Sequence, residues 1–114
     1  MSESSGIVKN GRRSRRQAPK TSIRVCCFRG LLGLGPNIAA GLLDVSQTGI
    51  RLLLSANVPV GQEIDVVLET VASRQIKARG QVVWVVPTSD GKVCVGVAFI
   101  KPLGYADLQL VTRT

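Results

Sequence analysis

The longest alternating segment of the chain is RQIKARGQVVWVV, at residues 74–86. Apolar or small residues occupy every second position from Ile76 through Trp84, and the intervening positions are polar as far as Gln81. A period of two is typical of a strand with one buried and one exposed face. The segment therefore predicts a long β-strand that carries Trp84 on its buried face, with a bend favoured at Gly80.

Five further strand signals surround this segment, separated by Gly, Pro, Asn and Asp, which interrupt strands. They lie at residues 21–28, 38–45, 49–55, 62–69 and 92–100. The pair Asp90-Gly91 predicts a hairpin turn before the last strand, and residues 103–111 favour a short helix. Six short strands without helical crossovers predict an all-β antiparallel barrel or sandwich. Closure into a barrel would remove the exposed strand edges.

The net charge of +8 on 114 residues is concentrated at the amino terminus. Residues 1–30 contain eight basic residues and one acidic residue, whereas residues 31–114 contain seven basic and six acidic residues. Residues 1–20 show no apolar periodicity, so we expect a flexible basic arm at 1–20 and a folded domain at 21–114. A cationic arm on a nearly neutral body predicts an anionic partner.

The composition also excludes several classes of protein. The chain has no histidine, which removes the Ser/His/Asp and Cys/His catalytic arrangements and the His-containing zinc sites. Among the seven carboxylates, only Asp44 lies in a suggestive motif, and no acid–base pair is apparent from spacing. We therefore expect no enzymatic activity, no metal and no cofactor.

Cysteine usage and hydropathy predict a cytoplasmic protein. The three cysteines are Cys26, Cys27 and Cys94, an odd number with two of them adjacent, which favours reduced thiols over disulfides. The longest segment without a charged residue, 30–43, has fourteen residues and contains four glycines and Pro36. Because a spanning helix needs about twenty apolar residues, we expect no membrane insertion.

The arm contains one Arg-x-x-x-Arg pair, formed by Arg12 and Arg16, with Arg13 and Arg15 between them. Guanidinium groups are suited to bidentate contacts with phosphate or with the O6/N7 edge of guanine. Considered alone, the same arginines would also suit a solvated tail or a nonspecific nucleic-acid arm.

A second motif, Asp-x-Ser-x-x-Gly, lies at residues 44–49, between two predicted strands. Asp44 can accept hydrogen bonds from ring N–H or amino groups, and Ser46 can donate to a phosphate oxygen. Gly49 permits either a close approach of backbone or a positive φ. An ordinary polar turn that closes a hairpin would have the same composition.

Together the two motifs, 28 residues apart from Arg16 to Asp44, resemble the PilZ domain family. The segment ARGQVVWV at 78–85 is similar to the family's long penultimate strand, and VGVAF at 95–99 is similar to its closing strand. The resemblance extends over nearly the whole chain from Arg12. It implies a six-stranded antiparallel β-barrel with a short C-terminal helix that binds the bacterial second messenger cyclic di-GMP.

The resemblance also implies roles for individual residues. Arg12 and Arg16 would clamp phosphates and guanine edges from the arm, while Asp44, Ser46 and Gly49 would line the barrel surface. Four weaker candidates are Arg13, Arg15, Arg51 and Gly96. Arg51 fits a solvated strand position better than a ligand contact, and Gly96 would equally suit the relief of crowding in the barrel.

The predicted function is a stand-alone cyclic di-GMP receptor that orders its arm on binding and signals through a protein partner. We expect no DNA partner, and homodimer formation stays open. The alternatives are a small basic barrel that binds nucleic acid nonspecifically, or a degenerate PilZ adaptor that binds protein only. Aromatic residues make up only 4% of the chain, which disfavours a stacking surface for nucleic acid.

Overall fold

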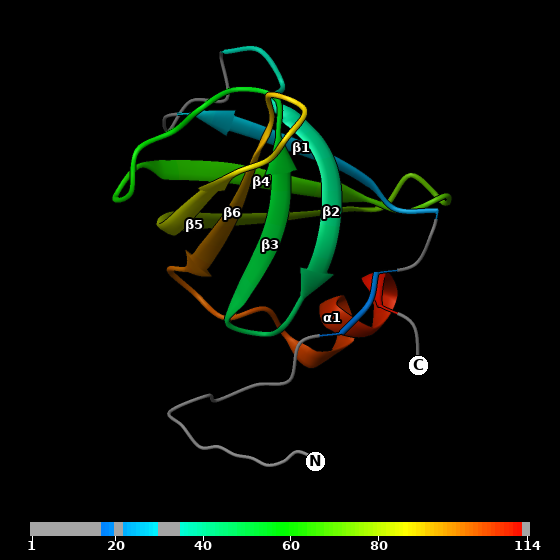
Figure 1. Cartoon of the computed structure of the whole chain (residues 1–114). Coiled ribbons are helices and arrows are strands. Elements are labelled where there is room, and N and C mark those ends of the chain that lie inside the picture. Colours follow the sequence, from blue (N-terminus) through cyan, green and yellow to red (C-terminus); the bar gives the residue numbers. More distant parts are fainter. Residues whose placement is uncertain (1–16, 20–21, 30–34, 113–114) are drawn as a thin grey trace, which may run out of the picture.

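The computed structural model describes residues 17–19, 22–29 and 35–112. They contain six strands and one helix in the order expected from the sequence (Figure 1). The elements are β1 (Arg24–Arg29), β2 (Ala39–Val45), β3 (Gly49–Leu54), β4 (Glu63–Glu69), β5 (Gln75–Pro87), β6 (Val93–Phe99) and α1 (Tyr105–Val111). Each element begins and ends within three residues of its predicted range, so the all-β fold and the short C-terminal helix are confirmed.

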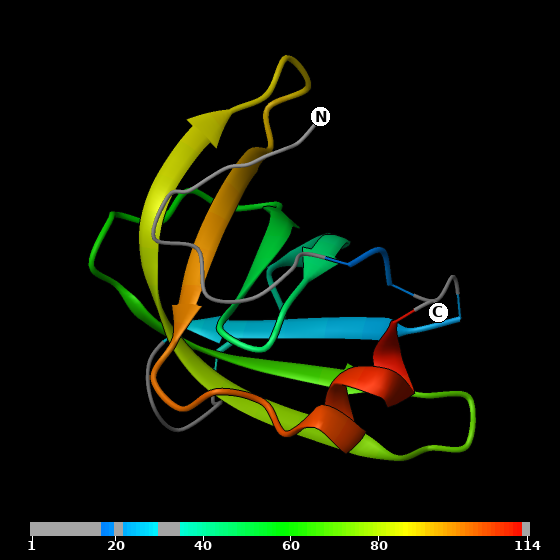
Figure 2. The same cartoon turned by 90° about the horizontal axis from the view of Figure 1, so that it is seen from below.

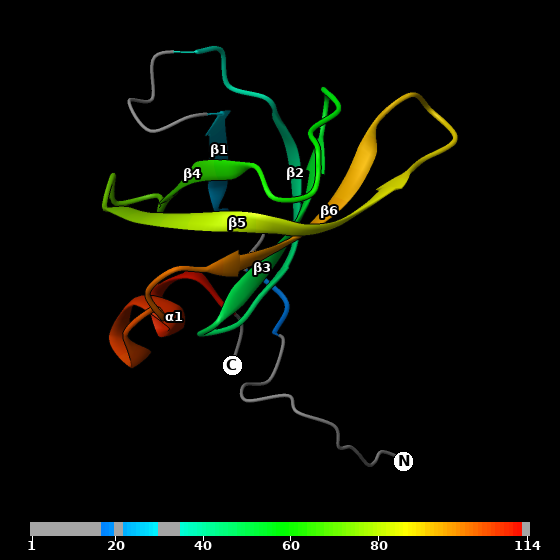
Figure 3. The ribbon, with the colours of Figure 1, turned by 90° about the vertical axis from the view of Figure 1, so that its left-hand side faces the viewer.

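The strands form one antiparallel sheet in the order β1-β4-β5-β6-β3-β2. The two strands at the ends of this order, β1 and β2, approach each other at the residues that directly precede β2. There the N–H of Ile38 donates to the carbonyl of Cys27 in β1 at 2.9 Å, and Asn37 Oδ1 accepts the N–H of Cys27 at 2.8 Å. The sheet is therefore a nearly closed barrel, as predicted, and its curvature is visible in Figure 3.

The interior of the barrel is filled by the alternating apolar residues of the strands. On β4, for example, Ile64, Val66 and Leu68 are buried, and the residues between them are not. The helix α1 lies at one end of the barrel (Figure 2), where its Leu108 and Val111 join the core. This packing explains why a helix of only seven residues is stable, since isolated helices of this length are not.

Trp84 does not lie in the core, so the prediction from simple alternation is wrong at this residue. Val82 is buried, yet Trp84 pairs with Gly96 of β6 across a β-bulge that separates Val82 from Trp84. The extra residue of the bulge reverses which side chains point inward. Beyond it, Val85 pairs with the fully buried Val95, and Trp84 lies half-buried on the outer face.

Candidate ligand-binding site

The end of the basic arm is attached to β2 by two backbone hydrogen bonds. The N–H of Gln17 donates to the carbonyl of Val45 at 2.8 Å, and the N–H of Val45 donates to the carbonyl of Gln17 at 3.0 Å. This reciprocal exchange is the closely spaced pattern of an antiparallel ladder. Val45 lies between Asp44 and Ser46, so the arm joins the barrel beside both polar residues of the predicted motif.

The same segment of the arm also contacts the residue that follows α1. Pro19 forms an isolated bridge with Thr112, whose hydroxyl donates to the carbonyl of Leu108 at 2.8 Å. Figure 1 shows residues 17–19 between the end of β2 and α1. This segment therefore connects the predicted motif to the end of the helix.

Ser46 organises the turn between β2 and β3. Its hydroxyl oxygen accepts the N–H groups of Thr48 at 3.3 Å and Gly49 at 3.2 Å. Its own N–H donates to the carbonyl of Gly49 at 2.8 Å, and its hydroxyl donates to the same carbonyl at 3.3 Å. Serine side chains commonly complete turns in this way. Ser46 is 3% exposed, and it holds the turn that presents the rest of the motif.

Asp44 is paired with Arg51 on the neighbouring strand. Nε of Arg51 donates to Oδ2 of Asp44 at 2.6 Å, and Nη2 of Arg51 lies 2.5 Å from the same oxygen. This hydrogen bond raises the pKa of Arg51 above its usual value. The side chain of Arg51 is 43% exposed and that of Asp44 is 11% exposed. Arg51 is therefore more than a solvated strand residue, because it orients a largely buried carboxylate.

Gly49 is required because the backbones of β3 and β6 approach closely. A Cβ at this position would lie 2.6 Å from the carbonyl oxygen of Val97. Among the described residues, the glycines with positive φ are Gly61 and Gly91. Of the two explanations that the sequence offered for Gly49, the close approach of backbone is the one observed.

Gly96 provides space for the indole of Trp84. A Cβ on Gly96 would overlap Nε1 and Cε2 of that ring, so this glycine does relieve crowding. The strand register also places Asp44 opposite Arg51, Arg51 opposite Gly96, and Gly96 opposite Trp84. These four residues form one row across the outer face of β2, β3, β6 and β5.

Comparison with protein-family models matches the PilZ domain over residues 10–113. The chain belongs to the PilZ domain family. PilZ domains are binding and adaptor domains, and the family is one of cyclic di-GMP-binding domains. The match includes both motifs and the whole barrel. Comparison with curated proteins finds no match.

The PilZ barrel brings three of the predicted site residues together at the β2–β3 turn, namely Asp44, Ser46 and Gly49. Sequence reasoning did not foresee that Trp84 would share a face with Asp44. An available signal was the small residue Gly96 on the adjacent predicted strand, since glycine often marks close packing in strands. Four predicted arginines lie outside the described residues and stay predictions: Arg12, Arg13, Arg15 and Arg16.

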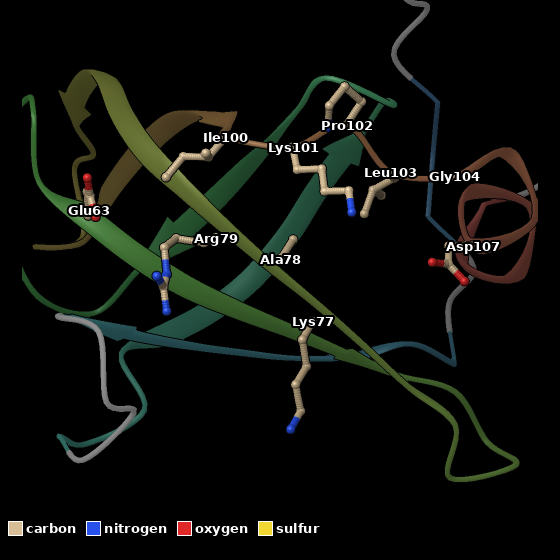
Figure 4. Close-up of a pocket in the computed structure, with 10 residues that line it drawn as sticks. All are labelled: Glu63, Lys77, Ala78, Arg79, Ile100, Lys101, Pro102, Leu103, Gly104 and Asp107. Atoms are coloured by element: carbon tan, nitrogen blue, oxygen red, sulfur yellow. The ribbon is translucent and has the colours of Figure 1, made fainter.

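A hollow in the surface of the PilZ domain lies between β5 and the segment that leads into α1 (Figure 4). Its volume is about 580 Å³, and it contains none of the predicted site residues. The lining carries the cations Lys77, Arg79 and Lys101 together with the acids Glu63 and Asp107. Because both signs of charge are present, this hollow is poorly matched to a ligand with two negative charges.

Metal-binding side chains are not grouped in the described part of this PilZ domain, where no three Cys, Asp or Glu residues could share an ion. Its three cysteines are free thiols, and burial raises the pKa of Cys27 to about 12. None of the helical structure within the described ranges has the length and hydropathy needed to cross a bilayer.

Proposed function

We propose that this PilZ domain is a cyclic di-GMP receptor, with the ligand held between the basic arm and the outer face of β2 and β3. The observation that carries the proposal is the pair of backbone hydrogen bonds between Gln17 and Val45. They hold the end of the arm beside Asp44 and Ser46. Arg16 directly precedes Gln17 in the sequence, so we expect the arginine motif to reach the carboxylate motif.

The chemistry of the ligand matches these residues. Cyclic di-GMP has two phosphates, each with one negative charge, and two guanines. Arginines such as Arg12 and Arg16 suit the phosphates and the O6/N7 edge, whereas a carboxylate suits the N1 and N2 donors. An ionised carboxylate has about four acceptor positions. Asp44 can therefore accept from guanine as well as from Arg51.

We infer that binding orders the arm against the barrel. The cluster RRSRR at residues 12–16 places four positive charges within five positions, and these charges repel one another until an anion neutralises them. Ordering a segment on binding costs several kcal/mol of the gross interaction energy. Several charge-assisted hydrogen bonds must therefore act together, so loss of one arginine should weaken binding more than loss of an exposed ion pair would.

We further propose that a protein partner detects the ordered arm in the bacterial cytoplasm. The bridge between Pro19 and Thr112 supports this proposal. Pro19 is close to Gln17 in the sequence, so a change in the conformation of the arm at Gln17 would also alter the contact of the arm with the end of α1. No catalytic step is part of this function.

Calorimetric titration with cyclic di-GMP, GTP and a single-stranded oligonucleotide tests the proposal. The wild type should bind cyclic di-GMP selectively, and Arg16→Ala and Asp44→Asn should each weaken this binding at least tenfold. Asp65→Asn is the matched control, because Asp65 is also paired with an arginine on the neighbouring strand, Arg79, at 3.1 Å. This variant should bind as the wild type does.

The two alternative functions predict different titrations. A nonspecific nucleic-acid binder would prefer the oligonucleotide, lose affinity steeply with salt and be unaffected by Asp44→Asn. An adaptor that binds protein only would give no heat with any of the three ligands. Either result would refute the proposed receptor.

A further inference from the structure

The hollow between β5 and the segment that leads into α1 contains apolar surface that the domain leaves uncovered. Ile100 is 60% exposed, and Pro102 is exposed as well, whereas Leu103 is buried. The N–H of Ile100 donates to the carbonyl of Arg79 on β5 at 2.9 Å, so this segment is anchored to the barrel. The volume of about 580 Å³ lies in the range of ligand sites, about 300–1,000 Å³.

The charged side chains of this hollow have few partners. Neither Lys77 nor Lys101 forms an ion pair with a residue of the described ranges, and the same holds for Glu63 and Asp107. Figure 4 shows Glu63 and Asp107 at opposite ends of the hollow, with the two lysines between them. The middle of the hollow therefore favours an acidic group, and its ends favour basic ones.

This arrangement fits a polypeptide better than a small anion. Protein interfaces commonly have an apolar centre and a polar rim, and the hollow combines exposed apolar residues with charges of both signs. An extended peptide rises about 3.3 Å per residue. An apolar and an acidic residue a few positions apart could therefore contact Ile100 and the lysines at the same time.

The wall of the hollow is hydrogen-bonded to the turn of the proposed ligand site. The N–H of Leu103 donates to the carbonyl of Gln47 at 2.8 Å, and the N–H of Phe99 donates to the carbonyl of Thr48 at 2.9 Å. Gln47 and Thr48 lie inside the motif at residues 44–49. A shift of this turn on ligand binding would therefore move Leu103 as well.

The helix α1 connects the hollow to the basic arm. Asp107, in the first turn of α1, lines the hollow, and Thr112, directly after α1, forms the bridge with Pro19. A helix rises about 1.5 Å per residue, so α1 is only about 10 Å long. A specific protein interface buries about 800 Å² on each partner. A protein bound at the hollow would therefore also reach the end of the arm.

We propose that the hollow is the docking site for an extended segment of a protein partner, which carries an acidic side chain beside an apolar one. The acidic group pairs with Lys101 and Lys77, and the apolar group packs on Ile100 and Leu103. This inference rests on the proposed function, because it names the surface at which the partner detects the ligand-bound domain.

A phage-displayed library of random peptides provides the probe. It is selected on the full-length wild type, once with saturating cyclic di-GMP and once without. The enriched peptides should share an acidic residue beside an apolar one. As synthetic peptides they should shift the amide NMR signals of Ile100, Lys101 and Gly104 in the wild type. Replacing the acidic residue of the peptide by its amide should weaken binding about tenfold.

Two variants, each with a matched control, locate the binding. Lys101→Glu and Ile100→Ser should each weaken peptide binding about tenfold. Lys92→Glu makes the same change of charge on the β5–β6 turn, and Val60→Ser removes an apolar side chain that is 63% exposed; neither residue lines the hollow. Both controls should bind the peptides as the wild type does. If a variant does not fold, the NMR shifts in the wild type decide the question.

The contact between the hollow and the ligand turn predicts coupling. Cyclic di-GMP should change the affinity for the selected peptides about threefold or more, and the peptides should change the affinity for cyclic di-GMP by the same factor. Equal peptide affinity with and without cyclic di-GMP would contradict the role of the hollow in detecting the ligand.

The outcomes separate this inference from the function on which it rests. If the wild type binds cyclic di-GMP by calorimetry, but no acidic and apolar peptide is enriched or the enriched peptides bind Lys101→Glu normally, the docking site is refuted and the receptor stands. If such peptides bind at the hollow but cyclic di-GMP gives no heat, the receptor is refuted and the docking site belongs to an adaptor. A wild type that dimerises while Lys101→Glu stays monomeric would place a second copy in the hollow and overturn the proposal.

Discussion

Arg51 and Asp44 face each other across β2 and β3, and both nitrogen contacts from Arg51 converge on one oxygen of Asp44, Oδ2. The side chain of Asp44 is only 11% exposed, so this carboxylate has little access to water and depends on its partners for hydrogen bonds. Such a carboxylate is held in one orientation before any ligand arrives. The pair therefore links the stability of the β2–β3 hairpin to the geometry of the proposed site.

Arg51→Ala should lower the free energy of unfolding by about 1–3 kcal/mol, because it removes two donors from a nearly buried carboxylate. Urea denaturation measures this change. The matched variant Arg79→Ala disrupts the pair with Asp65, whose side chain is more exposed at 24%, and should cost about 1 kcal/mol or less. Equal losses in the two variants would contradict a special role for the Asp44–Arg51 pair.

Gln17→Pro should weaken cyclic di-GMP binding, because proline lacks the N–H that donates to the carbonyl of Val45. Calorimetry should show at least a tenfold loss of affinity, while the barrel unfolds at nearly the wild-type urea concentration. Gln17→Ala keeps the backbone N–H and serves as the control. Wild-type affinity in Gln17→Pro would show that the bridge does not position the arm.

Gly49→Ala should destabilise the barrel by about 1–3 kcal/mol, because its methyl group would force β3 away from the backbone of β6. Gly35→Ala is the control, since a Cβ there would meet no atom within 4 Å. Thermal unfolding should show a clear decrease for the first variant and almost none for the second. A stable Gly49→Ala variant with weakened binding would instead indicate that Gly49 contacts the ligand directly.

Cys27 should be unreactive toward thiol reagents in the folded protein, because burial raises its pKa to about 12 from 9.0 and the thiolate is the reactive form. At pH 8, Cys26 and Cys94, which are only partly buried, should react first, and Cys27 should react after urea is added. The variant Cys27→Ala should show the same reaction when folded and one thiol fewer when unfolded.

The raised pKa of Cys27 also sets a pH dependence of stability. In the folded state the neutral thiol is favoured, so its contribution to stability is fully present below pH 9.0 and is lost as the pH rises toward 12. The free energy of unfolding of the wild type should therefore decrease over this range more steeply than that of Cys27→Ala. Identical slopes would contradict the burial of this thiol.

The strand positions could be predicted because each depends on local pattern. Alternation within β4, for example, places Ile64, Val66 and Leu68 on one face whatever the partner strand is. The turn at Asp90-Gly91 could also be predicted from the sequence, and Gly91 has the positive φ that glycine tolerates. The two motifs and their spacing were sufficient to indicate the family.

The arrangement of the site could not be predicted in the same way. The bulge between Val82 and Trp84 depends on how β5 aligns with β6, and no pattern within β5 reveals it. The pairing of Arg51 with Asp44 depends on the register of the β2–β3 hairpin.

The amino-acid pattern alone therefore decided that this chain forms short alternating strands, a basic amino-terminal arm and a polar turn at residues 44–49, because these properties depend on neighbouring residues. Tertiary structure decided that Gln17 joins β2 at Val45 and that Trp84 lies on the outer face in the row of Asp44. Both facts are set by hydrogen bonds between segments far apart in the chain, and such pairing is specified only when the whole barrel has formed.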